Sequence, residues 1–176
     1  MNNAKITALC GMITALSVVL MLISTVLPIL MYVLPFLTGL LVLFIEDLSG
    51  KKYAVAVFFC VSLLSLIFLT DKETALAYVL FFGYYPIIKE PVEKLPKLLA
   101  YLLKFAIFNT AAVLSGVIAV SVFGVSGEEY AEFGKYTVPI FLALANVMFI
   151  LYDLSIRKYR NMLKMLAAKV AKSFRI

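Results

Sequence analysis

Long runs of apolar residues, separated by short charged segments, constrain this chain more than any other feature. Lys5 is followed by an apolar run that reaches Leu27, and comparable runs recur along the 176 residues. A helix needs about 20 mostly apolar residues to cross the hydrocarbon core of a bilayer. Because 64% of the residues are hydrophobic and only 15% are charged, the chain lacks the polar surface of a soluble domain. The sequence therefore predicts an integral membrane protein.

The predicted fold is all-α, a six-transmembrane-helix bundle over residues 1–155 followed by a C-terminal amphipathic basic helix over 156–176. The expected spans cover residues 6–27, 34–46, 53–70, 74–88, 98–123 and 136–155. Pro28 and Pro35 separate the first two spans, because proline disfavours helix in the residue before it. The run 74–88 is short and contains Gly83 and Pro86. We expect this span to be tilted, partly unwound or continued into the interface.

The basic residues predict the orientation of the chain, since loops rich in Lys and Arg stay in the cytoplasm. With six spans and a cytoplasmic N-terminus, only Lys72 and Lys135 among the 16 Lys and Arg residues face outward. Both termini are therefore expected on the cytoplasmic side of a bacterial cell membrane. Tyrosines near span ends, including Tyr85 and Tyr152, are expected at the interface as part of an aromatic belt.

The tail over 156–176 combines an apolar and a basic helical face. Ile156 and Leu163 fall on one side at 100° per residue, and Arg157 and Lys164 fall on the other. This pattern predicts a helix in the inner interface, with its cations toward anionic lipids. It serves either as a topology anchor or as a docking surface for a partner. The net charge of +6 is therefore expected to favour contact with a membrane surface, and no nucleic acid is expected as a partner.

Small residues form a stripe on the first predicted helix. Ala8, Gly11 and Ala15 fall along nearly one line at helical spacing. In lipid, small side chains let two helix backbones approach closely. The stripe is expected to pack either inside the protein's own bundle or against another subunit.

Two amides, Asn109 and Asn146, lie near the middle of the fifth and sixth predicted spans. An unpartnered polar group there costs about 1 to 3 kcal/mol or more. They are expected either to bond to each other or to backbone, or to line a cavity that recognises a polar ligand. Lys104, two turns inside the fifth span, is expected to extend to the interface as an anchor.

The side chains that usually carry catalysis or bind metal are scarce. The sequence has no His, and its two cysteines, Cys10 and Cys60, lie in predicted spans. Zinc chemistry, His-based acid–base catalysis and a disulfide framework are therefore poorly supported. No Gly-Lys-Ser/Thr loop for nucleotide phosphates is present. We expect no enzyme activity, catalytic residue, metal or cofactor.

An acidic group lies in the predicted outer loop between the fifth and sixth spans. It consists of Glu128, Glu129 and Glu132. A solvated acidic loop is one interpretation, and a ligand lid or a cation site is the other.

In length, span number, cytoplasmic termini and first helix, the chain resembles the substrate-binding S component of energy-coupling factor (ECF) transporters. In that family a stripe like Ala-x-x-x-Ala contacts the transmembrane coupling subunit, and Ala8, Gly11 and Ala15 are the matching residues here. The resemblance implies uptake of a vitamin or other micronutrient from outside. A separate coupling subunit and ATPase subunits would supply the energy.

The resemblance also implies a substrate pocket among the later helices. The candidate pocket residues are Asn109, Asn146 and Tyr78, with the segment from Pro28 to Pro35 as a possible lid. Because the chain lacks Trp and His and has no charge in the outer halves of its helices, an aromatic or weakly polar substrate suits it best.

A competing interpretation is a non-transporting scaffold that resembles the cell-shape protein MreD, which is similar in size and helix number. A bacterial membrane protein with neither role is the third. If Asn109 bonds to Asn146 in a packed interior, the scaffold is favoured. An outward-facing cavity lined by these amides would favour the substrate binder.

Overall fold

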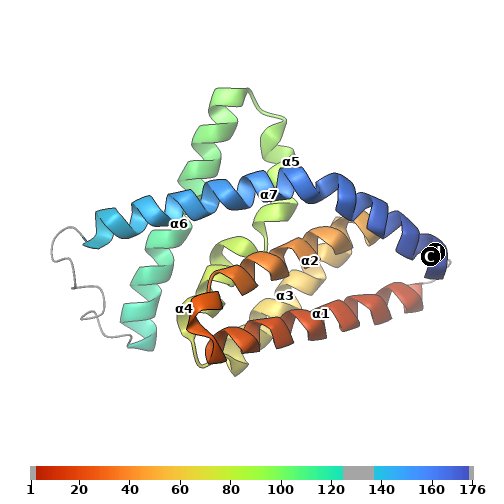
Figure 1. The fold of residues 1–176 in the computed structure, drawn as a ribbon, viewed down its shortest axis with the longest axis horizontal. Coiled ribbons are helices and arrows are strands. Elements are labelled where there is room, and N and C mark those ends of the chain that lie inside the picture. The colour runs from red at the N-terminus through yellow and green to blue at the C-terminus, as the bar shows by residue number, and fades with distance from the viewer. Residues whose placement is uncertain (1–2, 125–136, 175–176) are drawn as a thin grey trace.

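The computed structural model describes residues 3–124 and 137–174, and within these ranges every regular element is a helix (Figure 1). In chain order the elements are α1 (Asn3–Val26), the 3-10 helix η1 (Pro28–Leu30), α2 (Val33–Ser49), α3 (Lys51–Phe68), α4 (Lys72–Ala77), the π-helix η2 (Tyr78–Phe82), α5 (Tyr85–Glu93), α6 (Lys97–Phe123) and α7 (Thr137–Phe174). The all-α prediction is confirmed for this part of the chain.

The first three helices pack against one another in an antiparallel array (Figure 1). The break predicted at Pro28 is present, and Pro35 lies in the first turn of α2, where its missing N–H is not needed. Gly50 alone connects α2 to α3. Its φ of 92° and its N–H bond to the Glu46 carbonyl, 2.9 Å, end one helix and start the next. That backbone conformation favours glycine.

The predicted fourth span is divided into three short helical pieces. Asp71 starts α4, because its carboxylate accepts the N–H groups of Glu73 and Thr74 at 3.1 and 3.3 Å. The chain then widens into the π-helix η2, whose last bond joins the Gly83 N–H to the Tyr78 carbonyl at 2.8 Å. Pro86 follows in the first turn of α5. The expectation of a partly unwound segment is consistent with these breaks.

The last predicted span and the basic tail form one continuous helix, α7, of 38 residues. This differs from the predicted separate interfacial helix over 156–176. Part of the tail's apolar face also contacts protein, because Ile156 is fully buried in the core and Leu163 packs on that core. Burial against α2 therefore takes up apolar surface that the sequence pattern alone assigned to lipid.

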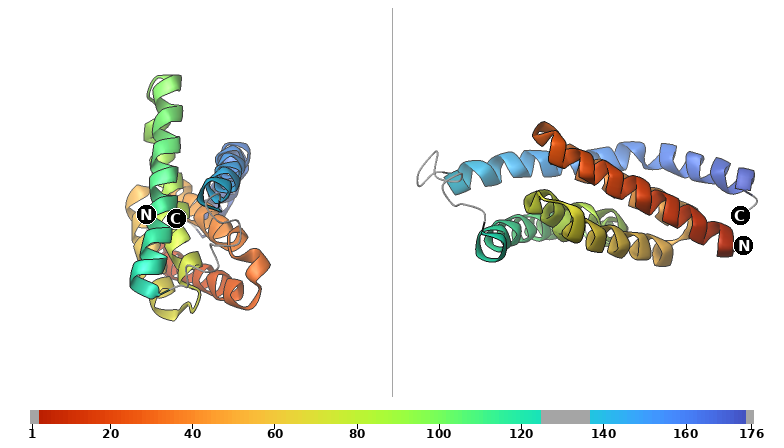
Figure 2. Two further views of the ribbon diagram at one scale, coloured as in Figure 1. Left: turned by 90° about the vertical axis from the view of Figure 1, so that its left-hand side faces the viewer. Right: turned by 90° about the horizontal axis from the view of Figure 1, so that it is seen from below.

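Four helices are long and apolar enough to cross a membrane: Ala4–Val26, Lys51–Phe68, Lys97–Phe123 and Pro139–Ser173. This is compatible with a membrane protein. It is fewer than the six predicted spans, because α2 has only 17 residues and the 74–88 region is broken. The helices also depart from a parallel bundle, since α6 runs across α7 instead of alongside it (Figures 1 and 2).

Aromatic rings fill the core where η2, α6 and α7 meet. The ring of Phe81 lies 4.6 Å from Tyr85, 4.9 Å from Phe108 and 5.7 Å from Phe149, measured between centroids. Tyr85 and Tyr152 are both buried, so the belt prediction is wrong for these two tyrosines. Each hydroxyl has a partner inside the protein, which lets the ring sit away from the interface.

Candidate functional site

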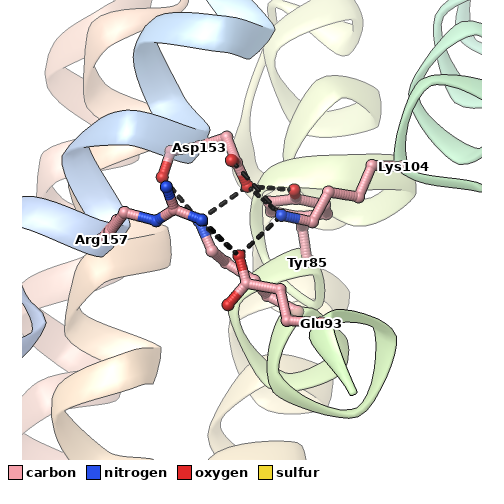
Figure 3. Close-up of polar contacts among 6 residues, drawn as sticks. Tyr85, Glu93, Lys104, Asp153 and Arg157 are labelled. Carbon is pink, nitrogen blue, oxygen red and sulfur yellow. Dashed lines mark hydrogen bonds and ion pairs between the residues drawn. The ribbon is translucent and has the colours of Figure 1, made fainter. Parts of the chain in front are cut away.

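A network of charged side chains, two of them buried lysines, lies where α5, α6 and α7 meet (Figure 3). At its centre, Asp153 of α7 accepts a bond from the Lys89 ammonium of α5 at 2.6 Å. The Lys104 ammonium of α6 contacts the two oxygens of the same carboxylate at 3.1 and 3.3 Å. One carboxylate thus joins three helices.

Three more side chains complete the network. The Tyr85 hydroxyl donates to Asp153 at 2.5 Å. Glu93, at the end of α5, accepts from Lys104 at 2.7 Å and lies 3.7 Å from the Lys89 ammonium. The Arg157 guanidinium is more remote, 3.8 Å from Glu93. We call these six residues the ionic network.

Burial makes the pairing within the ionic network necessary. The side chains of Lys89 and Lys104 are only 2% and 4% exposed, and a buried ion without a partner costs several kcal/mol. Burial lowers the pKa of Lys89, and its bond to Asp153 opposes that shift. Three cations face two carboxylates, Glu93 and Asp153, so the network carries one positive charge in excess.

A second ion-pair group extends the contact between α7 and its neighbours. Arg160 bonds to Glu90 of α5 at 2.8 Å and lies 3.9 Å from Asp47 at the end of α2. The guanidinium lowers the pKa of the Glu90 carboxyl. For Asp47, burial raises the pKa and the attraction of Arg160 opposes the shift. These pairs fix the C-terminal half of α7 against α2 and α5.

A cavity of about 270 Å³ adjoins the ionic network between α6 and α7. Lys104, Asp153 and Arg157 form its charged part. The remaining wall is aromatic and aliphatic, formed by Tyr101, Phe105, Phe149, Ile150 and Leu154. Within the described residues, no group of His, Cys, Asp and Glu is suited to a metal ion. The site therefore offers charge and apolar surface, not metal ligands.

No protein-family model matches the chain, and neither a curated protein nor a solved structure matches it.

The predicted pocket amides bond to each other. The Asn109 amide donates to the Asn146 oxygen at 3.1 Å, and the Asn146 amide donates back at 2.9 Å. Each also donates to the carbonyl four residues earlier in its own helix, at 2.9 and 2.7 Å. All four amide N–H groups thus have partners. Neither residue lines the cavity at the ionic network or the open apolar depression between η2 and α6.

Tyr78, the third predicted pocket residue, is separate from the amide pair. It is fully buried at the start of η2, with its ring 6.0 Å from that of Phe58. Its hydroxyl has no hydrogen-bond partner in the described part of the chain. The predicted lid contacts α4, because the Thr74 hydroxyl lies 3.4 Å from the Met31 carbonyl. The structure does not bring the three predicted pocket residues together.

The small-residue stripe of α1 faces away from the rest of the protein. Ala8, Gly11 and Ala15 are all exposed, and a Cβ added at Gly11 would meet no atom within 4 Å. The opposite face of α1 contacts the core through buried residues such as Ser17 and Met21. Of the two expected uses, packing inside the protein's own bundle does not occur at these positions among the residues that the structure describes.

Sequence reasoning missed most of the ionic network. The expectation for Lys104 is wrong, because its ammonium turns into the protein and pairs with Glu93 and Asp153. One available signal was Asp153 itself, an acidic residue at the end of an apolar run that needs a partner. Another was the four-residue spacing of Lys89 and Glu93 on one helix. The acidic group at Glu128, Glu129 and Glu132 lies outside the described residues.

Proposed function

We propose that this chain is a non-enzymatic, multi-pass subunit of an assembly in a bacterial cell membrane, and that it binds its partner through α1. The observation that carries the proposal is the outward-facing stripe of Ala8, Gly11 and Ala15. Small residues are favoured where transmembrane helices approach closely. A stripe that the protein leaves uncovered is therefore suited to the helix of another protein.

Both termini are proposed to be cytoplasmic. The start of α1 and the end of α7 lie at the same end of the molecule (Figure 2), as an even number of passes requires. In a six-pass arrangement α2 returns beside α1, and the segment from α4 to α5 completes the pass before α6, which is steeply inclined to α7. The exposed cations of α7 would then contact anionic lipids of the inner leaflet.

One specific form of the proposal is a scaffold that resembles MreD and transports nothing. The bonding of Asn109 and Asn146 favours this form, because their bonds to each other and to backbone carbonyls together occupy every amide donor of the two residues. The cavity at the ionic network also favours it, since its volume of about 270 Å³ is below the usual 300 to 1,000 Å³ of small-molecule sites. The depression between η2 and α6 is larger, about 400 Å³, but it is open and mostly apolar.

The second form is the S component of an ECF-type transporter, which would take up a vitamin or other micronutrient with a coupling subunit and ATPase subunits. It is supported by the resemblance of the first helix and by the exposure of Gly11 and Ala15, which the family's coupling contact requires. In this form, Asn109 and Asn146 would have to separate before either amide could bind a substrate.

Purification of the chain from its native membrane tests the proposal and separates its two forms. Recovery of a coupling subunit with ATPases would identify an S component, and recovery of cell-wall machinery would identify a scaffold. In either form, Gly11→Leu and Ala15→Leu should abolish recovery of the partner. Recovery of a partner that is unaffected by both substitutions would contradict the assignment to α1.

A further inference from the structure

The excess positive charge of the ionic network is located at Arg157. The other cations are close to carboxylates, with Lys89 2.6 Å from Asp153 and Lys104 2.7 Å from Glu93. Arg157 has only a 3.8 Å contact to Glu93, which it shares with Lys104. Its side chain is 63% exposed and lines the cavity between α6 and α7. An anion that binds there would balance the network.

The cavity wall indicates what kind of anion fits. Beyond its charged part the lining is apolar, with Phe105, Phe149 and Ile150 from two different helices. A small hydrophilic anion would leave these side chains facing water. A ligand that carries an anionic group next to hydrocarbon would satisfy both parts of the wall.

The size and the position of the cavity restrict the class of ligand further. At about 270 Å³ the cavity holds only part of a larger molecule, so the rest of the ligand must lie outside it. Asp153 lies near the end of the predicted span 136–155 and Arg157 follows it, at the level expected for inner-leaflet headgroups. Basic pockets between transmembrane helices on this side bind anionic lipid headgroups.

We propose that the cavity between α6 and α7 binds an anionic phospholipid of the inner leaflet, with its phosphate at Arg157 and its first acyl carbons against Phe105, Phe149 and Ile150. This site rests on the membrane placement proposed above and adds a defined lipid partner. The phosphate is the recognised group, and inorganic phosphate is the alternative source of the same chemistry. A guanidinium is well suited to it, because its planar fork can bind two phosphate oxygens.

A single fluorescent reporter can test this site, because the chain contains no tryptophan. Tyr101 lines the cavity and is exposed, so Tyr101→Trp places a reporter there. The purified full chain is reconstituted in vesicles of phosphatidylcholine and phosphatidylglycerol, in which one lipid at a time carries brominated acyl chains. Bromine quenches fluorescence on contact, so the ratio of quenching by the two lipids measures the local preference.

The expected result is stronger quenching by brominated phosphatidylglycerol than by brominated phosphatidylcholine. In the same background, Arg157→Gln should reduce this preference by about fivefold, because it removes the guanidinium that contacts the phosphate in the cavity. The matched control is Lys158→Gln, which removes an exposed charge one residue away that lines no part of the cavity. It should leave the preference largely unchanged.

Four results would overturn the proposal. Equal quenching by both lipids, or equal effects of Arg157→Gln and Lys158→Gln, would show that the cavity has no selectivity for the anionic lipid. Loss of the preference on addition of inorganic phosphate would assign the site to a free anion. Absence of quenching by both lipids would contradict the membrane placement itself, which distinguishes failure of the proposed function from failure of the lipid site alone.

Discussion

Asp153 is the residue at which the three helices of the ionic network meet. Two buried ammonium groups, from Lys89 and Lys104, depend on its carboxylate for charge balance. Breaking a buried ion pair from one side is costly, because the remaining charge keeps its desolvation penalty and loses its partner. Its neutral replacement therefore reports directly on the ionic network.

We predict that Asp153→Asn lowers the free energy of unfolding by about 3 kcal/mol. The value is at the lower end of the range for buried pairs, because Glu93 still lies near both lysines. Reversible unfolding in mixed detergent measures the change. The double variant Asp153→Asn with Lys89→Met should be less destabilised than Asp153→Asn alone, since it also removes a buried charge. Equal stability of Asp153→Asn and the parent chain would contradict the network.

The amide pair makes a smaller and separable contribution. Asn109→Ala should lower stability by about 0.6 to 1.7 kcal/mol, the range for hydrogen bonds between helices in lipid. Asn146→Ala should add little in the double variant, because the shared bonds are already lost. Thr110→Ala, at an exposed neighbouring position, is the control and should have little effect. Fully additive effects of the two asparagine substitutions would indicate that the amides do not bond to each other.

At the scale of elements, the sequence predicted the helices better than their ends and contacts. Apolar runs and Pro28 were sufficient for α1, α3 and α6, because a long apolar run in lipid must satisfy its backbone bonds as a helix. The π-helix at Tyr78–Phe82 was not predictable, since no local pattern distinguishes it. The burial of Ile156 also depends on core residues that are distant in the sequence.

The candidate site was likewise predicted in part from the sequence. Polarity alone identified Asn109 and Asn146 as residues that need partners, and the structure selects one of the two expected arrangements. The ionic network joins residues from position 85 to position 157, and periodicity within one helix carries no information about such pairs. Exposure of the α1 stripe was equally undetermined, because small residues suit internal and external helix contacts alike.

Helix α1 provides a prediction in which stability and association separate. Gly11→Leu should leave the stability of the purified chain unchanged or raise it by up to about 1 kcal/mol, because the position is open and leucine favours helix. The same substitution should abolish recovery of the partner when the chain is purified from its native membrane. The control Leu16→Phe adds bulk at an exposed position of α1 outside the stripe. The partner should still be recovered with this variant. A clear loss of stability in Gly11→Leu would mean that the stripe is packed internally.

For the whole molecule, the proposed topology places the turn between α3 and α4 outside and the turn between α5 and α6 inside. Cysteines introduced singly by Thr70→Cys and Lys94→Cys, both at exposed positions, can report this after Cys10 and Cys60 are replaced by alanine. In intact cells, an impermeant thiol reagent should label the first variant and not the second. The reverse pattern, or labelling of both, would contradict the proposed orientation.

The central claim is that this chain works by presenting α1 to another membrane protein, and site-specific photo-cross-linking in living cells tests it most directly. A benzophenone amino acid at Met12, exposed beside the stripe, is compared with one at Leu63, exposed on α3. We predict a discrete protein adduct from Met12 that Gly11→Leu abolishes, and no such adduct from Leu63. The absence of a protein adduct at Met12, or the same adducts from both positions, would contradict the account.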